Sequence, residues 1–137
     1  MERTLAIIKP DAFKAGHAGQ IIDAYLKAGL AIRGMKLIHM TPAQAGGFYL
    51  VHKDRPFYGE LCAFMSSGPC IVIVLEGENA IQRNRDLMGP TDSTKAPKDT
   101  LRGRFGTNLQ NNAVHGSDAP ATASYEIGYF FNGLELV

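Results

Sequence analysis

The order of strand-like and helix-like segments limits the fold of this chain more than any other feature of its sequence. The clearest strand is CIVIVLEG, residues 70–77, which is rich in β-branched residues and is bounded by turn formers. The apolar run TLAIIKP, residues 4–10, fits a strand buried on both faces. Two more segments read as strands: LAIRGMKLIHM, residues 30–40, and AVHG, residues 113–116.

Helical patterns separate these strands. Residues 16–29 place one apolar face on a helix, formed by Ile21, Ile22, Tyr25 and Leu26. TPAQ, residues 41–44, is a capping box that starts a helix running to about His52. A second short helix after Pro56 would complete a helical hairpin.

The second half of the chain adds two more helices. Asn79 is expected to cap a helix that runs to about Met88. Residues 120–131 read as the last helix, with Ile127, Phe130 and Phe131 facing the core. Between them, residues 89–112 have no sustained period, and so long a loop in a small domain is usually functional.

This order contains two β-α-β units and predicts a ferredoxin-like α+β fold. In that fold helices would pack on one face of a four-stranded antiparallel sheet. A doubly wound α/β sheet is an alternative that the pattern alone does not exclude. A length of 137 residues suits a single domain, so we expect residues 1–137 to form one.

Charge and cysteine content exclude several classes of function. The net charge of +1 lacks the basic excess of a dedicated nucleic-acid binder. Cys62 and Cys70 have no zinc or disulfide spacing and are expected to be reduced, packed thiols. The apolar run within the first ten residues is too short for a signal peptide or a membrane span. We therefore expect a soluble, cytoplasmic protein.

Positive charge is nevertheless concentrated in residues 83–104. This segment contains six basic and three acidic residues, which fits either a solvated loop or a site for a polyanion. The basic residues are Arg83, Arg85, Lys95, Lys98, Arg102 and Arg104; the acidic ones are Asp86, Asp92 and Asp99.

The octapeptide NNAVHGSD, residues 111–118, is the most distinctive motif for chemistry. A nucleophilic imidazole needs one free ring nitrogen and an acceptor that holds the other. Gly116 is expected to leave room beside His115 for a bulky electrophile. Ser117 and Asp118 could orient a reacting group or begin the next helix as capping residues, and the octapeptide leaves both roles open.

Residues suited to phosphate accompany this histidine, although no P-loop or dinucleotide-binding glycine motif is present. Each of them alone could be an ordinary solvated side chain. Together with His115 they suggest phosphoryl transfer by clamping and positioning. They are Lys9, Arg85, Thr91, Arg102 and Asn112.

With these motifs in register, the chain closely resembles the nucleoside diphosphate kinases from Glu2 to about Phe131. The resemblance rests on RTLAIIKPDA, FYLVHKDRPF, GPCIVIVLEGENAI, TLRGRF and, above all, NAVHGSD. It implies a ferredoxin-like fold and a ping-pong exchange of the γ-phosphate between nucleoside tri- and diphosphates. It also implies a phosphohistidine intermediate, broad base specificity, Mg²⁺ held mainly by the nucleotide phosphates rather than by a protein metal site, and a homo-oligomer built from dimers.

The resemblance also assigns roles to single residues. His115 would be the nucleophile, reacting through Nδ1, with Glu126 on the other ring nitrogen, Ser117 in support and Tyr49 nearby. Lys9 and Asn112 would bind the sugar 3′-hydroxyl. The remaining assignments are phosphate contacts from Arg85, Thr91, Arg102 and His52, and a base site formed by Phe57 and Leu109. From the residues alone, Glu126 could be an exposed helix glutamate, and Phe57 and Tyr49 could be core aromatics.

Three segments depart from the family pattern. Asp92-Ser93 follows Thr91 where the family usually has Asn-Pro, Arg104 replaces an acidic residue, and DAPATAS, residues 118–124, lacks a common glutamate. None is a residue assigned to chemistry. The departures bear on the conformation of the loop and on contacts between subunits.

Two other functions compete with this one. GHAG, residues 16–19, matches the GxxG loop with which KH domains clamp a nucleic-acid backbone, but the tetrapeptide is common and the net charge nearly neutral. A histidine phosphocarrier would pass its phosphate to a partner protein. Discharge of the phosphoprotein by a nucleoside diphosphate alone distinguishes the kinase from the carrier.

Overall fold

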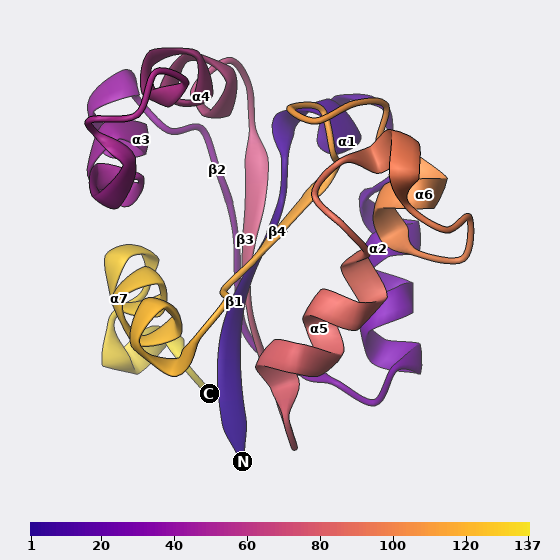
Figure 1. Cartoon of the computed structure of the whole chain (residues 1–137). Coiled ribbons are helices and arrows are strands. Elements are labelled where there is room, and N and C mark those ends of the chain that lie inside the picture. Colours follow the sequence, from indigo (N-terminus) through magenta and orange to yellow (C-terminus); the bar gives the residue numbers. More distant parts are fainter.

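The computed structural model describes all 137 residues and has an antiparallel sheet at its centre (Figure 1). The strands are β1 (Glu2–Ile8), β2 (Ala31–Ile38), β3 (Cys70–Gly77) and β4 (Val114–Gly116). Their order across the sheet is β2-β3-β1-β4, and every neighbouring pair is antiparallel. The predicted ferredoxin-like sheet is therefore confirmed, and the doubly wound alternative, which needs parallel strands, is wrong.

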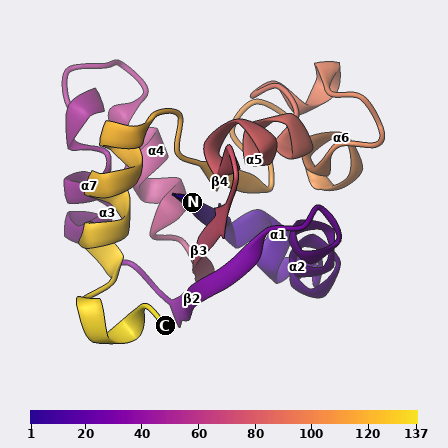
Figure 2. The same cartoon turned by 90° about the horizontal axis from the view of Figure 1, so that it is seen from below.

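Helices cover both faces of this sheet, so the expectation of a single covered face is wrong (Figures 1 and 2). α2 (Ala18–Lys27) and α5 (Ala80–Met88) pack on one face. The other face carries the hairpin of α3 (Pro42–Phe48) and α4 (Tyr58–Met65), together with α7 (Pro120–Phe130).

The reason lies in the central strand β1. Successive side chains of a strand point to opposite faces. Leu5 and Ile7 belong to the apolar cluster under α3, α4 and α7, whereas Ala6 and Ile8 belong to the cluster under α2 and α5. All four are fully buried, as the continuous apolar run predicted. A strand that is apolar on both faces requires helices on both.

Shorter elements occupy the connections. α1 (Pro10–Lys14) follows β1 directly, and α6 (Leu101–Phe105) lies within the segment expected to be an irregular loop. That segment also contains a 3₁₀ turn at Ser93–Lys95, so the expectation is only partly right. The helix expected to reach His52 ends at Phe48 and is followed by a 3₁₀ turn at Leu50–His52.

Helix caps were predicted with mixed success. Thr41 and Gln44 form the expected capping box, with bonds of 3.1 and 2.9 Å. Asn79 stands at the N-cap of α5 with a φ of 51°, but its side chain makes no capping bond. Oε1 of Glu2 instead accepts a hydrogen bond from the Ile81 backbone N–H at 2.9 Å.

Other expectations for the core can be compared directly. Cys62 and Cys70 are free and buried, which confirms them as packed thiols. Ile21 and Tyr25 are fully buried, whereas Leu26 is half exposed. None of the helices combines the length and the apolar character required to cross a bilayer.

Candidate active site

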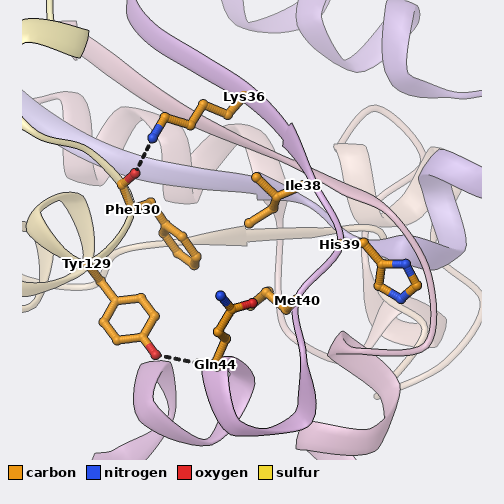
Figure 3. A pocket seen from close by; sticks show the side chains of 7 residues that line it. All are labelled: Lys36, Ile38, His39, Met40, Gln44, Tyr129 and Phe130. Carbon is orange, nitrogen blue, oxygen red and sulfur yellow. Dashed lines mark hydrogen bonds between the residues drawn. The ribbon is translucent and has the colours of Figure 1, made fainter.

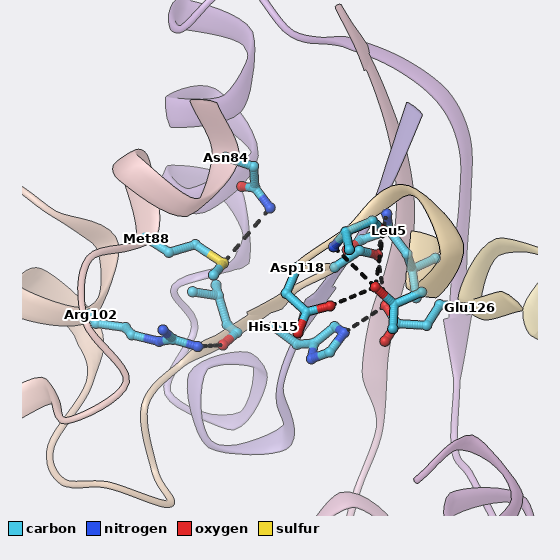
Figure 4. A network of polar contacts seen from close by, with 11 residues as sticks. Leu5, Asn84, Met88, Arg102, His115, Asp118 and Glu126 are labelled. Atoms are coloured by element: carbon cyan, nitrogen blue, oxygen red, sulfur yellow. Dashed lines mark hydrogen bonds and ion pairs between the residues drawn. The ribbon is translucent and has the colours of Figure 1, made fainter. Parts of the chain in front are cut away.

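His115 lies in the middle of the three-residue strand β4, opposite Ile7 of β1. Its side chain is 19% exposed. Nε2 of the ring lies 2.9 Å from Oε1 of Glu126 on α7, and Figure 4 shows the ring pointing toward this carboxylate. An ionised carboxylate can only accept, so Nε2 is the donor in this bond, and the neutral form of the ring then has its lone pair on Nδ1.

Ser117 extends this arrangement back to the sheet. Its hydroxyl donates to the same oxygen of Glu126 at 2.7 Å and accepts from the Leu5 backbone N–H at 3.1 Å. Glu126 is thus held by a side chain that is anchored to the central strand. The capping alternative for Ser117 does not hold. Asp118, by contrast, accepts from the hydroxyl of Thr122 in the first turn of α7.

The structure explains the glycine at position 116 differently from the sequence-based expectation. A Cβ at this position would lie 2.5 Å from Nδ2 of Asn84 and 2.9 Å from Sδ of Met88, both on α5. The glycine therefore lets β4 approach α5 closely, and it does not open space beside the imidazole for an electrophile.

A row of aromatic rings leads from His115 along the helical hairpin. The His115 and Tyr49 ring centroids are 6.4 Å apart, those of Tyr49 and His52 are 6.4 Å apart, and those of His52 and Phe57 are 5.6 Å apart. Phe48, which the sequence did not single out, also packs edge-on against His115 at 5.4 Å. The hairpin thus brings Tyr49, His52 and Phe57 to the same side of the sheet as the histidine.

Tyr49 is buried, and its hydroxyl has no hydrogen-bond partner. Burial raises the pKa of this phenol, and the nearby carboxylate of Glu126 raises it further. It is therefore a neutral hydroxyl close to the Glu126 carboxylate.

Lys9 and Asn112 form a second polar pair. Nζ of Lys9 donates to Oδ1 of Asn112 at 2.8 Å, and Nδ2 of Asn112 donates to the Thr91 carbonyl at 3.0 Å. Burial lowers the pKa of Lys9 to about 8, with the charge of Arg102 acting in the same direction and that of Asp11 against it. The structure thus brings Lys9, Thr91 and Asn112 together, as the sequence led us to expect.

Arg102 is buried and ties two backbone segments together. Its guanidinium donates to the carbonyls of Gly89 at 3.0 Å and Val114 at 2.9 Å. Burial, and after it the charge of Arg85, lowers the pKa of Arg102 to about 10. Arg85 itself is exposed on α5 and also helps to lower the pKa of Asp118, after the Thr122 hydrogen bond. Positive charge is therefore concentrated beside His115.

Phe57 and Leu109 are both exposed, at 47% and 63%. Phe57 precedes α4, and Leu109 lies in the segment that leads to β4. One hydrogen bond connects these two regions, from Nε2 of Gln110 to the carbonyl of Glu60 at 3.5 Å. Two apolar side chains open to solvent on neighbouring segments are available to pack against a planar ligand.

The backbone just before His115 has an unusual conformation. Ala113 has a φ of 73°, in the left-handed region that residues with a Cβ rarely adopt. The Val114 N–H donates to the Asn112 carbonyl at 2.8 Å, which closes a tight turn around Ala113. The Ala113 N–H donates to Oδ2 of Asp11 at 3.1 Å. Sequence reasoning missed Asp11, although it directly follows the Lys9-Pro10 pair.

A metal centre and a surface hollow are the two alternatives to a site at His115. The chain has no group of three or more histidine, cysteine, aspartate or glutamate side chains that could hold a metal ion. A hollow of about 620 Å³ lies between β2, α3 and α7, lined in part by Lys36, Ile38 and Tyr129 (Figure 3). None of the residues predicted for the active site lines this hollow.

Comparison with known proteins decides the family. The family model described as "Nucleoside diphosphate kinase" matches residues 2–136. A protein of that name from Syntrophotalea carbinolica is 58% identical over the whole of both chains. The chain belongs to the nucleoside diphosphate kinase family. Its activity is therefore that of a phosphotransferase that uses nucleoside tri- and diphosphates.

Solved structures agree with this assignment. A crystal form of the Aquifex aeolicus nucleoside diphosphate kinase superposes on this kinase with a TM-score of 0.98, at 50% identity over 99% of each chain. A halophilic nucleoside diphosphate kinase from Halobacterium salinarum, solved in complex with CDP, gives 0.96 at 38% identity. It covers 99% of this kinase and 91% of its own chain. The KH-domain and phosphocarrier alternatives are therefore set aside.

Proposed function

We propose that this chain transfers the γ-phosphate in two half-reactions through a phosphohistidine at His115. The observation that carries the proposal is the 2.9 Å bond from Nε2 of His115 to Glu126, which leaves Nδ1 as the nucleophile. In the first half-reaction Nδ1 attacks the γ-phosphorus of a nucleoside triphosphate. An N–P bond forms, the bond to the β–γ bridging oxygen breaks, and the nucleoside diphosphate leaves.

The second half-reaction reverses the first with a different nucleoside diphosphate. A terminal β-phosphate oxygen attacks the phosphohistidine, the N–P bond breaks, and Nδ1 regains its lone pair. Throughout, Glu126 accepts the Nε2–H, and Ser117 holds Glu126 to the sheet. As the ring gains positive character in the phosphorylated state, the carboxylate stabilises it.

The remaining residues position the nucleotide. Lys9 and Asn112, already paired at 2.8 Å, would bind the sugar 3′-hydroxyl. Contacts to the phosphates are assigned to Arg85, Thr91, Arg102 and His52. Of the five donors of Arg102, two are used by carbonyls and Nε is buried without a partner, which leaves two for phosphate.

The base would lie between Phe57 and Leu109. Their exposure supports this role, because a ring that stacks on a ligand must be accessible before the ligand binds. Tyr49, between His115 and His52 in the row of rings, would contribute a neutral hydroxyl near the reacting histidine.

Magnesium is assigned to the nucleotide and not to a protein site. The chain supplies no cluster of ligands for it, whereas nucleotide phosphates are hard oxygen ligands of the kind Mg²⁺ prefers. When bound there, the ion neutralises charge on the phosphates. Arg85 and Arg102 would then orient the γ-phosphate toward Nδ1 of His115.

We also propose that residues 1–137 act as one domain within a homo-oligomer built from dimers. β2 is an edge strand, and two of its own apolar side chains, Met35 and Leu37, are at least half exposed, as is Leu26 on α2. An edge strand with an apolar border commonly pairs with another chain. The free thiols of Cys62 and Cys70 suit the reducing cytoplasm.

The test of the proposed chemistry is labelling with γ-labelled ATP followed by a chase with GDP. The wild type is expected to acquire an acid-labile, base-stable phosphate that GDP alone removes. His115→Ala should neither label nor turn over, while His39→Ala, a matched control on an exposed histidine, should behave as wild type. Label that survives acid, or that remains in His115→Ala, would overturn the proposal.

A further inference from the structure

Asp11 makes a contact that the proposed chemistry does not use. Oδ2 of its carboxylate accepts a hydrogen bond from the Ala113 N–H at 3.1 Å, although 102 residues separate the two in the chain. The Ala113 carbonyl in turn accepts from the Lys9 N–H at 2.8 Å. Both backbone polar groups of Ala113 are therefore bonded to the segment at the end of β1.

Ala113 needs such an attachment. Its φ of 73° is in the left-handed region, and the Asn112 and Val114 backbone groups bond across it at 2.8 Å. A residue with a Cβ stays in this conformation only when its surroundings impose it. Ala113 is fully buried, so an N–H without a partner there would be costly.

The turn sets the positions of two proposed active-site residues. Asn112 precedes Ala113, and its side chain reaches Nζ of Lys9. His115 follows two residues later, in register with Ile7. A change in the turn would therefore displace the sugar contact and the nucleophile together.

We propose that Asp11 is a positioning residue for phosphoryl transfer. Its carboxylate holds Ala113 in the turn that places Asn112 and His115, and its negative charge favours the ammonium form of Lys9, which bonds to Asn112. This inference rests on the proposed function, since it assumes that Lys9, Asn112 and His115 act on the nucleotide.

The charges around Lys9 support the second role. The ionised groups that act on its buried ammonium are Asp11 on α1 and Arg102 on α6, and they have opposite effects. Burial and Arg102 lower the pKa of Lys9, whereas Asp11 raises it. Burial raises the pKa of Asp11 itself, while the Ala113 N–H and the charge of Lys9 lower it.

Two variants separate the two roles. Asp11→Asn keeps an oxygen that can accept from Ala113 but removes the charge. Its kcat at pH 6.5 is expected to stay within about threefold of wild type, since a retained acceptor preserves the geometry. The alkaline limb of its kcat/KM profile should move to lower pH by about 0.5 to 1 unit.

Asp11→Ala removes both the acceptor and the charge. It is expected to lower kcat at every pH by about tenfold or more, because small displacements of reacting groups are costly. Adding Ala113→Gly should recover part of this loss, because glycine adopts positive φ without a Cβ penalty. Asp23→Asn, on an exposed carboxylate of α2, is the matched control and should leave both kcat and the pH profile unchanged.

The measurements are steady-state rates from pH 6 to 9.5 and the rate of phosphohistidine formation with γ-labelled ATP. Wild-type kcat and an unmoved alkaline limb in Asp11→Asn and Asp11→Ala would overturn the inference. So would a double variant that recovers none of the lost rate. If Asp11→Ala does not fold, the position of the alkaline limb of the kcat/KM profile of Asp11→Asn decides whether the inference holds. Failure of the wild type to label at all would instead overturn the proposed function.

Discussion

The ammonium group of Lys9 lies 2.8 Å from the amide oxygen of Asn112, although 103 residues separate them in the chain. The pair joins the end of the central strand to the segment that leads into the strand of the histidine. Because Lys9 is buried, its pKa is lowered to about 8, so its charge changes within the working range of most enzymes. Two predictions depend on this single group.

The first concerns the pH dependence of catalysis. Lys9 is charged below pH 8 and loses its proton as the pH rises through about 8. Because the profile of kcat/KM reports groups of the free enzyme, it is expected to fall on the alkaline side with an apparent pKa near 8. Steady-state rates with GDP as acceptor from pH 6 to 9.5 test this. A flat profile through pH 9.5 would contradict it.

The second concerns stability. The folded pKa of Lys9, about 8, is below the ordinary value of 10.5, so between these values the unfolded chain binds more protons and stability rises with pH. The shift corresponds to about 3 kcal/mol. The free energy of unfolding of the wild type minus that of Lys9→Met should increase by this order between pH 7 and 10.5 in urea titrations. The subtraction removes contributions from other titrating groups, and a constant difference would refute the prediction.

A third prediction tests Glu126. Glu126→Gln is expected to lower kcat by about tenfold or more without unfolding the chain, because the amide can present either an acceptor or a donor to the ring and so stabilise the wrong tautomer. Glu78→Gln, on an exposed glutamate, is the control. If the rates of Glu126→Gln matched the wild type from pH 6 to 9, Glu126 would have no orienting role.

A fourth prediction concerns substrate breadth. Neither Phe57 nor Leu109 can read the hydrogen-bonding edge of a base, and stacking contributes about 1 to 3 kcal/mol for any base. GDP, CDP and dTDP should therefore differ by less than about 100-fold in kcat/KM. Loss of the 3′-hydroxyl, in a 3′-deoxy diphosphate, should lower kcat/KM more than any change of base, since Lys9 and Asn112 are proposed to bind that hydroxyl. A preference above about 1,000-fold, or about 4 kcal/mol, would require a polar base reader.

The fifth prediction concerns packing under the nucleophile. Gly116→Ala would place a Cβ 2.5 Å from Asn84 and 2.9 Å from Met88, and it should destabilise the fold by about 1 to 3 kcal/mol. Gly128→Ala on α7, where a Cβ meets open space, should stabilise it by about 0.4 to 1 kcal/mol. Urea denaturation of the two variants gives the comparison. Equal effects would show that the approach of α5 does not explain Gly116.

Much of the fold was predictable because the strands of this chain carry strong local patterns. The apolar run at Leu5–Ile8 already indicated that helices on one face would not be enough. A strand without a polar face must be covered on both faces. α6 could not be predicted in the same way. It has five residues with a glycine at the centre, which is too short to show a helical period.

The same distinction between local patterns and long-range contacts applies to the residues of the site. Local patterns singled out His115, Ser117, Lys9 and Asn112, and the resemblance added Glu126. The structure brings these five residues into two hydrogen-bonded groups. Their roles in the reaction stay predictions. The functions of Gly116 and Asp11 depend on contacts with α5 and with Ala113, which no local pattern contains. Such contacts follow only from the way distant segments meet.

The position of β1 at the centre of the sheet also has a consequence for synthesis of the chain. Lys9 is synthesised 103 residues before its partner Asn112, and Asp11 is synthesised 102 residues before its partner Ala113. Contacts between segments so far apart form only after both have emerged. A nascent chain therefore carries only one half of the proposed site until residues 112–126 have emerged, and the site can form only after that.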